Sequence, residues 1–203
     1  MSAELWAPPS ELVPSSPADI ASECRDAALG FVNVVARSGG PREFIEWAVR
    51  RYRRATRHLR VPGAPLTLAG VRPDSRAMPD IVRDTRLSVV DELENAALAP
   101  ERARFVDWSV AHGLVAPFED RSGARGWLPV DGAGRLRERV LALFAVDWLV
   151  NPESYVRGLA VCHLCESVVL DEVTRETGFC SAHEVDKRWS GVHAVAATVD
   201  RRH

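Results

Sequence analysis

The amino-acid sequence predicts an α+β protein that is mostly helical, with a helical N-terminal part, a central β-hairpin and a small C-terminal treble-clef-like zinc module. Three observations support this fold class. Apolar residues recur at helical spacing through much of the chain that precedes the last cysteines. One stretch has the pattern of two short strands about a glycine-rich turn. Three of the four cysteines gather near the C-terminus with metal-ligand spacing.

Length and composition are those of an ordinary globular protein. The chain has 203 residues, of which 46% are apolar and 27% are charged, and its formal net charge is −2. A chain of this length buries a sizeable core without disulfides. The charge excludes a protein whose whole surface coats nucleic acid or anionic lipid, and the composition excludes collagen-like, wholly disordered and polytopic membrane classes.

The N-terminal part is expected to consist of a disordered tail over residues 1–16 and two helices. The first helix, over residues 17–37, begins at the helix-start pair Ser16-Pro17 and stops at two glycines. The second runs from Pro41 to near Leu59. Its predicted core-facing residues share one arc of a helical wheel: Phe44, Ile45, Ala48, Tyr52, Ala55 and Leu59.

Prolines and glycines divide the middle of the chain. Residues 61–78 indicate a linker that can hold a short strand at 65–71. A third helix is expected over residues 79–99, and a fourth from residue 100 to just before Gly113.

A β-hairpin is expected over residues 114–130, followed by a long apolar helix over 134–150 that ends at Asn151-Pro152. Asp147 interrupts the apolar run of that helix. A buried carboxylate needs a partner, such as an arginine or an indole N–H, so we expect Asp147 to be structural.

The chain is expected to divide into a tail (1–16), a mainly helical domain (17–155), a zinc-binding module (156–195) and a second tail (196–203). The N-terminus has neither the basic residues nor the apolar segment of a secretory signal, and the longest apolar run is too short to span a bilayer. We therefore expect a cytoplasmic protein that does not associate with membranes. The preference for arginine over lysine, with abundant alanine and valine, is typical of a high-GC bacterial genome.

The cysteines near the C-terminus have the spacing of a zinc site. Cys162 and Cys165 form one pair with two residues between them, and Cys180 and His183 form the second pair fourteen residues later. Each pair can place two ligands on one edge of a tetrahedron, and soft sulfur ligands select zinc or iron over magnesium or calcium. Three thiolates and one imidazole are typical of a closed structural zinc site.

Between the two pairs we expect a hairpin of residues 166–170 and 175–179, and after Cys180 a helix over 181–189. We call the turn Cys162–Cys165 the knuckle. A knuckle, then a hairpin, then two ligands at the start of a helix is the order of elements in a treble-clef zinc finger. His163 and His193 are alternatives to His183 as the fourth ligand.

The finger resembles the C-terminal zinc finger of CGNR-type bacterial proteins over residues 162–190. The resemblance rests on Cys162, Cys165, Leu170-Asp171, Thr174-Arg175, Phe179-Cys180-Ser181 and Lys187. Members of that family join the finger to a partly helical N-terminal domain and are regarded as transcription regulators, so the resemblance implies a DNA-binding regulator. The family's Cys-Gly-Asn-Arg tetrapeptide is absent here, and the region after Cys162 carries seven acids against five bases.

The basic feature lies in the second helix instead. Arg50, Arg53, Arg54 and Arg57 share the arc opposite the core-facing residues, and this arc is the candidate nucleic-acid-binding face. The alternative is an ordinary solvated helix face on which Glu46 and Arg50 pair.

No catalytic constellation can be assembled, so we expect no enzymatic activity. The sequence has no glycine-rich phosphate loop, His-Glu-x-x-His or Gly-x-Ser-x-Gly motif. The pair Cys162 and Cys165 resembles a redox Cys-x-x-Cys but lacks a βαβ context. We favour a DNA-binding transcription regulator with one structural zinc; a protein–protein adaptor and, with less support, a thiol oxidoreductase stay open.

Overall fold

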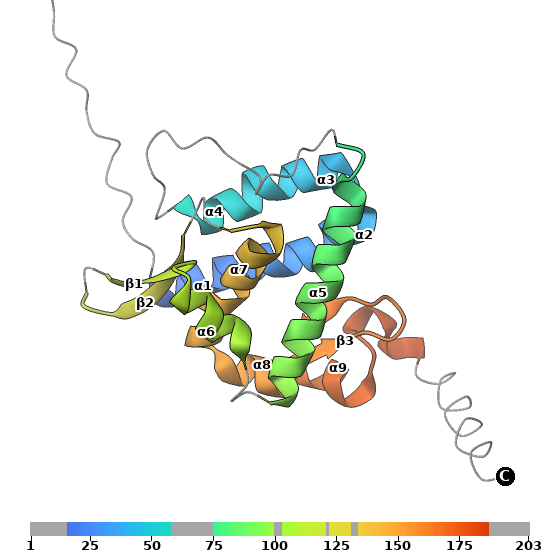
Figure 1. The fold of residues 1–203 in the computed structure, drawn as a ribbon. Coiled ribbons are helices and arrows are strands. Elements are labelled where there is room, and N and C mark those ends of the chain that lie inside the picture. The colour runs from blue at the N-terminus through green and yellow to red at the C-terminus, as the bar shows by residue number, and fades with distance from the viewer. Residues whose placement is uncertain (1–15, 58–74, 100–102, 121, 131–133, 187–203) are drawn as a thin grey trace, which may run out of the picture.

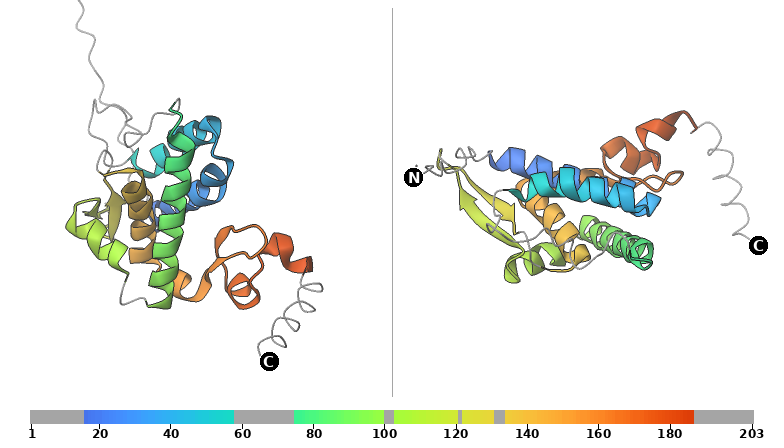
Figure 2. Two further views of the ribbon diagram at one scale, coloured as in Figure 1. Left: turned by 45° about the vertical axis from the view of Figure 1, so that its right-hand side comes forward. Right: turned by 90° about the horizontal axis from the view of Figure 1, so that it is seen from above.

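The fold is mostly helical and carries two small antiparallel sheets, as predicted. The computed structural model describes residues 16–57, 75–99, 103–120, 122–130 and 134–186. A hairpin of β1 (Val115–Glu119) and β2 (Arg125–Pro129) lies at one end of the helical body, and the C-terminal module, residues 159–186, lies at the other (Figure 1, Figure 2). The expected tails and most of the expected linker lie outside the described residues.

The first helical segment consists of α1 (Pro17–Gly30), the π-helical turn η1 (Phe31–Val35) and α2 (Ala36–Ser38). Its start is a capping box, because the Ser16 hydroxyl accepts from Asp19 N and the Asp19 carboxylate accepts from Ser16 N. Gly39 ends the segment in the left-handed conformation, with φ of 62°.

The second helical segment consists of α3 (Pro41–Glu46), the π-helical turn η2 (Trp47–Tyr52) and α4 (Arg53–Ala55). Four of the predicted core-facing residues are buried: Phe44, Ala48, Tyr52 and Ala55. Leu59 lies outside the described residues.

The prediction that Ile45 faces the core is wrong, since its side chain is 44% exposed. Trp47 is buried in its place: its ring lies 5.0 Å from that of Phe31, and its Nε1 donates to Ala27 O at 2.7 Å. A large indole that is both packed and hydrogen-bonded outweighs one isoleucine, so the helix turns its Trp47 side toward α1.

The remaining helices of the body are α5 (Met78–Leu98), α6 (Arg104–Ala111) and α7 (Leu136–Val150). In the hairpin between α6 and α7, Val115 pairs with Pro129 and Glu119 with Arg125. These elements agree with the predicted hairpin and helices to within a few residues.

Helix α7 is the centre of the core. Eleven of its fifteen residues are buried, and they cover all sides of the helix. Helices α1, α5 and α6 and strand β2 pack around it (Figure 1). A helix without a polar face has to be buried on every side, and the elements around α7 bury it.

Asp147 is the buried carboxylate of α7, and its side chain has no exposed surface. Its oxygens accept from the Tyr155 hydroxyl and from Asn151 Nδ2, both at 2.8 Å, and Arg25 Nη1 lies 3.9 Å away. Burial raises the pKa of Asp147, although these hydrogen bonds and Arg25 oppose the shift. The predicted arginine partner of Asp147 is confirmed. The other expected partner was an indole N–H, but the hydrogen-bond donors are the Tyr155 hydroxyl and the Asn151 amide.

The C-terminal module corrects a second prediction. After α8 (Pro152–Gly158), strand β3 (Leu159–Val161) pairs with β4 (Val168–Leu170), and residues 172–177 form helix α9 (Glu172–Thr177). The predicted hairpin between the two ligand pairs is therefore wrong, and the knuckle itself is the hairpin turn. Asp171 causes the difference, because its side chain accepts from Thr174 N at 2.8 Å and caps a helix.

The last described element is the 3-10 helix η5 (Ser181–Asp186), where a helix over 181–189 was expected; residues 187–189 lie outside the described residues. Among the helices that the structure describes, none is long and apolar enough to cross a membrane.

Candidate metal centre

Four predicted ligands meet in the C-terminal module. Cys162 and Cys165 lie in the turn between β3 and β4, and Cys180 and His183 lie where the chain leaves α9 and enters η5. One ligand atom from each of the four residues lies within 4.8 Å of the others. The structure therefore gathers a Cys3His group that could hold a metal ion such as zinc.

Three separations between the ligand atoms are close to those of a tetrahedral metal site. His183 Nδ1 lies 3.2 Å from Cys180 Sγ and 3.7 Å from Cys162 Sγ, and the sulfurs of Cys165 and Cys180 lie 3.7 Å apart. Zinc–ligand bonds of about 2.0–2.3 Å in a tetrahedron place the ligand atoms roughly 3.5–3.8 Å from one another. Two of these three separations fall within that range and the His183–Cys180 separation is somewhat shorter, so the group is compact enough to surround one metal ion such as zinc.

The electrostatics of the cysteines also favour a cation. Burial raises the pKa of the Cys162 thiol, but hydrogen bonds from neighbouring backbone N–H groups, including Cys180 N at 3.4 Å, lower it to about 5. Burial and hydrogen bonds with the other two thiols raise the pKa of Cys180. Three sulfurs at this separation cannot all ionise without a positive charge among them, and a divalent metal supplies that charge.

His163 lies in the knuckle but outside the ligand group. Its ring packs at 5.8 Å on the ring of Phe179, and a Cβ on Gly178 would come within 2.8 Å of its Nδ1. Gly178 has φ of 77° and ends α9, so this glycine serves both the turn and the approach of the imidazole. His193, the other alternative ligand, lies outside the described residues.

Three consecutive residues after the knuckle attach it to the helical body. Arg86 Nη2 on α5 donates to Glu166 O at 2.5 Å, and Arg37 Nη1 on α2 donates to Ser167 Oγ at 3.1 Å. At Val168 the Asn33 side chain makes two bonds, donating to the carbonyl at 2.7 Å and accepting from the N–H at 2.8 Å. We call residues 166–168 the docking segment.

The docking segment leads directly to the ligands. The Ser167 hydroxyl lies 3.2 Å from Cys165 Sγ, and Ser167 O accepts from Cys162 N at 2.9 Å. Glu166 has φ of 52°, a left-handed conformation that a non-glycine residue adopts at a cost. The bond from Arg86 to its carbonyl helps to hold that conformation.

Arg86 joins the module to the π-helical turn of the first segment. In η1 the Ala36 N–H donates to Phe31 O, whereas a regular α-helix would direct it to Val32 O. Arg86 Nε donates to Val32 O at 3.0 Å, so the arginine uses a carbonyl beside the widened turn. Its side chain is only 10% exposed, and Glu166 Oε2 lies 3.8 Å from its Nη1.

The predicted arginine face is exposed but largely occupied by carboxylates. Arg50 pairs with Glu46 at 3.0 Å on its own helix. Arg54 and Arg57 both pair with Glu23 of α1, at 2.9 Å and 3.1 Å. Arg53 is exposed and has no ion pair with another described residue. One residue of a different helix, Glu23, which the sequence did not associate with this face, thus holds two of the four arginines.

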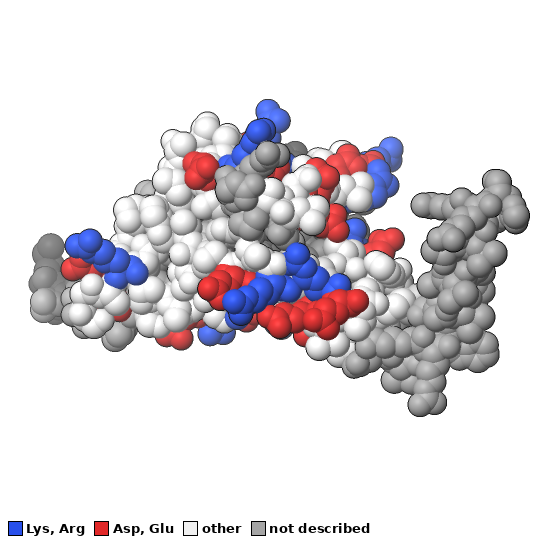
Figure 3. Space-filling view, turned by 90° about the horizontal axis from the view of Figure 1, so that it is seen from below, with Lys and Arg blue, Asp and Glu red and all other residues white. Residues whose placement is uncertain are grey.

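The face that includes the module has mixed charge. Seen from below, acidic and basic side chains alternate in one band instead of separating by sign (Figure 3). Arg157 of α8 lies 3.5 Å from Glu153, and Arg175 of α9 shares a hollow with Glu172 and Glu176. Such a surface has little attraction for a phosphate backbone.

Comparison of the chain with protein-family models, curated proteins and solved structures found no match in any of the three. The chemistry of the site therefore carries the functional conclusion. Sequence reasoning identified the ligands but missed Arg86, Asn33 and Glu23, since an isolated polar residue in a helix shows no long-range partner in the sequence.

Replacement of Arg86 by methionine tests its docking role. Arg86→Met should lower the free energy of unfolding of the metal-loaded chain by about 1.5–3 kcal/mol, since Val32 O and Glu166 O lose a charged donor. Urea denaturation measures this change. Arg83→Met is the matched control on α5: Arg83 is 63% exposed and pairs with Asp80 of the same helix, so its loss should cost under about 0.5 kcal/mol. Equal effects of the two substitutions would contradict the docking role.

Proposed function

We propose that Cys162, Cys165, Cys180 and His183 bind one zinc ion and that this zinc is structural. Three sulfurs and one imidazole are the ligand set that zinc prefers over magnesium or calcium. Four protein ligands complete a tetrahedron and leave no position for water or substrate. The observation that carries this proposal is the convergence of all four ligand atoms within 4.8 Å.

The zinc joins two segments of the module that also meet through the hydrogen bond from His163 N to Gly178 O at 2.9 Å and the packing of His163 on Phe179. The β3–β4 turn supplies two ligands, and the chain after α9 supplies the other two. Because the unfolded chain has no preformed site, the free energy of zinc binding becomes folding free energy of the module. Through the docking segment this stability also fixes the module on α2, α5 and η1.

We infer that the protein acts by binding DNA, as a regulator, and that it contacts phosphates through α3–α4. Within residues 41–57 there are six arginines against two glutamates. Arg53, which has no ion pair with another described residue, lies among them. The resemblance of the finger to CGNR-type proteins supports the same class of function, with the finger as the scaffold and the helices as the contact surface.

A protein-docking role is the second candidate, and the surface of the module favours it. Leu164 at the tip of the knuckle is 55% exposed and Val173, next to Glu172 on α9, is 48% exposed. Apolar side chains within interleaved charges are typical of the rim and core of transient protein interfaces.

Metal analysis of cysteine variants tests the structural zinc. The purified wild-type chain should contain close to one zinc ion, and Cys180→Ser should lose most of it and unfold at a lower temperature, because the hydroxyl is a poor zinc ligand. Cys24→Ala is the matched control, since Cys24 is buried in α1 away from the group and its loss should leave the zinc content unchanged. A wild-type chain without zinc, equal in stability to Cys180→Ser, would refute the site.

Gel-shift titration at several salt concentrations tests the DNA role. The double variant Arg50→Gln/Arg53→Gln should bind genomic DNA fragments more weakly, and the slope of log affinity against log salt should fall by about 2, one per lost phosphate contact. The charge-matched control is Arg83→Gln/Arg125→Gln, on α5 and the β1–β2 hairpin. Equal loss in both double variants, or no DNA shift by the wild-type chain, would reject the α3–α4 route and leave the docking role.

A further inference from the structure

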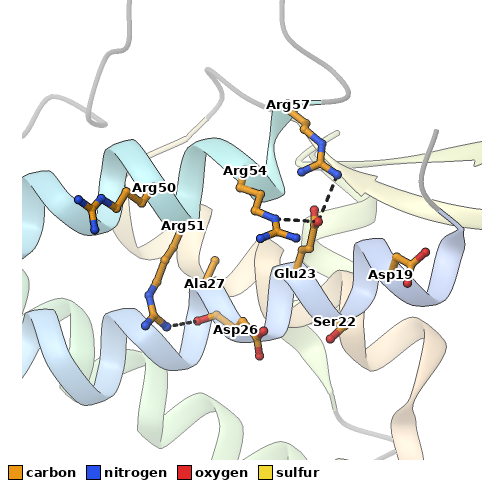
Figure 4. Close-up of a pocket in the computed structure, with 9 residues that line it drawn as sticks. All are labelled: Asp19, Ser22, Glu23, Asp26, Ala27, Arg50, Arg51, Arg54 and Arg57. Carbon is orange, nitrogen blue, oxygen red and sulfur yellow. Dashed lines mark hydrogen bonds and ion pairs between the residues drawn. The ribbon is translucent and has the colours of Figure 1, made fainter. Parts of the chain in front are cut away.

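A groove runs between α1 and the second helical segment. It encloses about 670 Å³, and its walls differ in charge. Four arginines line one wall, Arg50, Arg51, Arg54 and Arg57, and three acids of α1 line the other, Asp19, Glu23 and Asp26 (Figure 4). A volume of this size accommodates a small phosphorylated molecule or a short piece of a nucleic-acid backbone.

Glu23 occupies the arginine wall in the present structure. Its Oε1 accepts from Arg54 Nε at 2.9 Å and from Arg57 Nη2 at 3.1 Å, so one oxygen serves two guanidinium groups. Its Oε2 is buried and has no hydrogen-bond partner among the described residues. A single carboxylate therefore holds two cations with only half of its acceptor capacity in use.

Arg51 lies across α1 at the next turn of the groove. Its Nη1 donates to Asp26 O at 3.3 Å, and a Cβ on Gly30 would come within 2.9 Å of the Arg51 side chain. Glycine at position 30 lets this guanidinium lie against the helix. This hydrogen bond within the described part of the chain uses one of the five N–H donors of Arg51, so the others can bind a ligand.

We propose that this groove is a phosphate-binding site and that Glu23 holds the place of the phosphate when the site is empty. A phosphate monoester carries a charge of about −1.5 to −2 and three acceptor oxygens, whereas a carboxylate carries one charge and two oxygens. Several guanidinium groups in a fork geometry therefore favour phosphate over carboxylate. The phosphate lies against the wall of arginines, because Asp19 and Asp26 on the opposite wall repel an anion.

The phosphate can belong to a DNA backbone or to a free phosphorylated molecule. A backbone phosphodiester carries one charge and two unbridged oxygens, so the advantage over the Glu23 carboxylate is larger for a free phosphate monoester. If the phosphate belongs to DNA, the inference rests on the proposed DNA-binding function. If it belongs to a free molecule, the inference is independent of that function. In either case the ligand has to displace Glu23 from Arg54 and Arg57. Glu23 is thus a competitor that lowers the affinity of the groove for every anion.

Calorimetric titration of the zinc-loaded full chain with inorganic tripolyphosphate tests the site. Glu23→Gln should bind the probe several-fold more tightly than the wild-type chain, because the amide still fills the space but no longer competes as a charge. Arg54→Gln should bind it roughly tenfold or more weakly, as expected for the loss of charge-assisted hydrogen bonds. The charge-matched controls are Glu119→Gln and Arg125→Gln, which break an equivalent pair on the distant hairpin.

The results separate the site from the DNA function. Tighter binding by Glu23→Gln than by Glu119→Gln, with weaker binding by Arg54→Gln than by Arg125→Gln, supports the site. If the same pattern appears without any DNA shift, the site stands and its source is a free phosphorylated molecule. If tripolyphosphate does not bind, or if each variant equals its hairpin control, the proposal is overturned even where DNA binding is observed.

Discussion

The contact between the buried Arg86 guanidinium and the carbonyls of Val32 and Glu166 connects the two halves of the molecule. A buried guanidinium is tolerated only when its donors are satisfied, and here they reach one carbonyl in each half. Because Glu166 follows Cys165 directly, the orientation of the metal knuckle depends on a residue of α5. Arg86, together with Asn33 and Arg37, thereby links the metal knuckle to the packing of the helical body.

The π-helical turn η1 also connects the helical body to the C-terminal module, through Asn33. Its wider turn redirects the Ala36 N–H to Phe31 O, and Asn33 of the same turn bonds to both backbone groups of Val168. Such turns persist where a local loss of regular hydrogen bonding is offset by a specific contact. The C-terminal module is therefore docked by backbone recognition together with apolar contacts, since Leu159 and Val168 are buried in the main core.

Much of the fold and the metal ligands could be predicted from the sequence, because local rules decide them. The capping box at Ser16, the paired glycines after α2 and the spacing of Cys162, Cys165, Cys180 and His183 are each complete within a few residues. The two failures have different causes. Trp47 replaced Ile45 in the core because a hydrogen-bond partner on α1 was available, and no local pattern shows that partner. Asp171 is a local signal: its cap on Thr174 N starts a helix that includes part of the strand expected over 175–179.

The arginine face shows the same limit for function. In the sequence Arg54 and Arg57 are two cations of one helix. In the fold both are paired with Glu23, which competes with any anionic ligand for them. The strength of a basic helix as a phosphate reader thus depends on an acid thirty-one residues away from Arg54 in the chain. No periodicity within the second helical segment carries that information.

Amide hydrogen exchange with and without zinc tests the central claim, that metal binding fixes the module on the helical body. The Val168 N–H, which donates to Asn33 Oδ1 at 2.8 Å, should be protected in the zinc-loaded chain and exchange much faster after chelation. Amides of the buried helix α7 should keep their protection, since its core does not use the metal. Unchanged exchange at Val168 after zinc removal, or equal loss of protection in α7, would contradict the account.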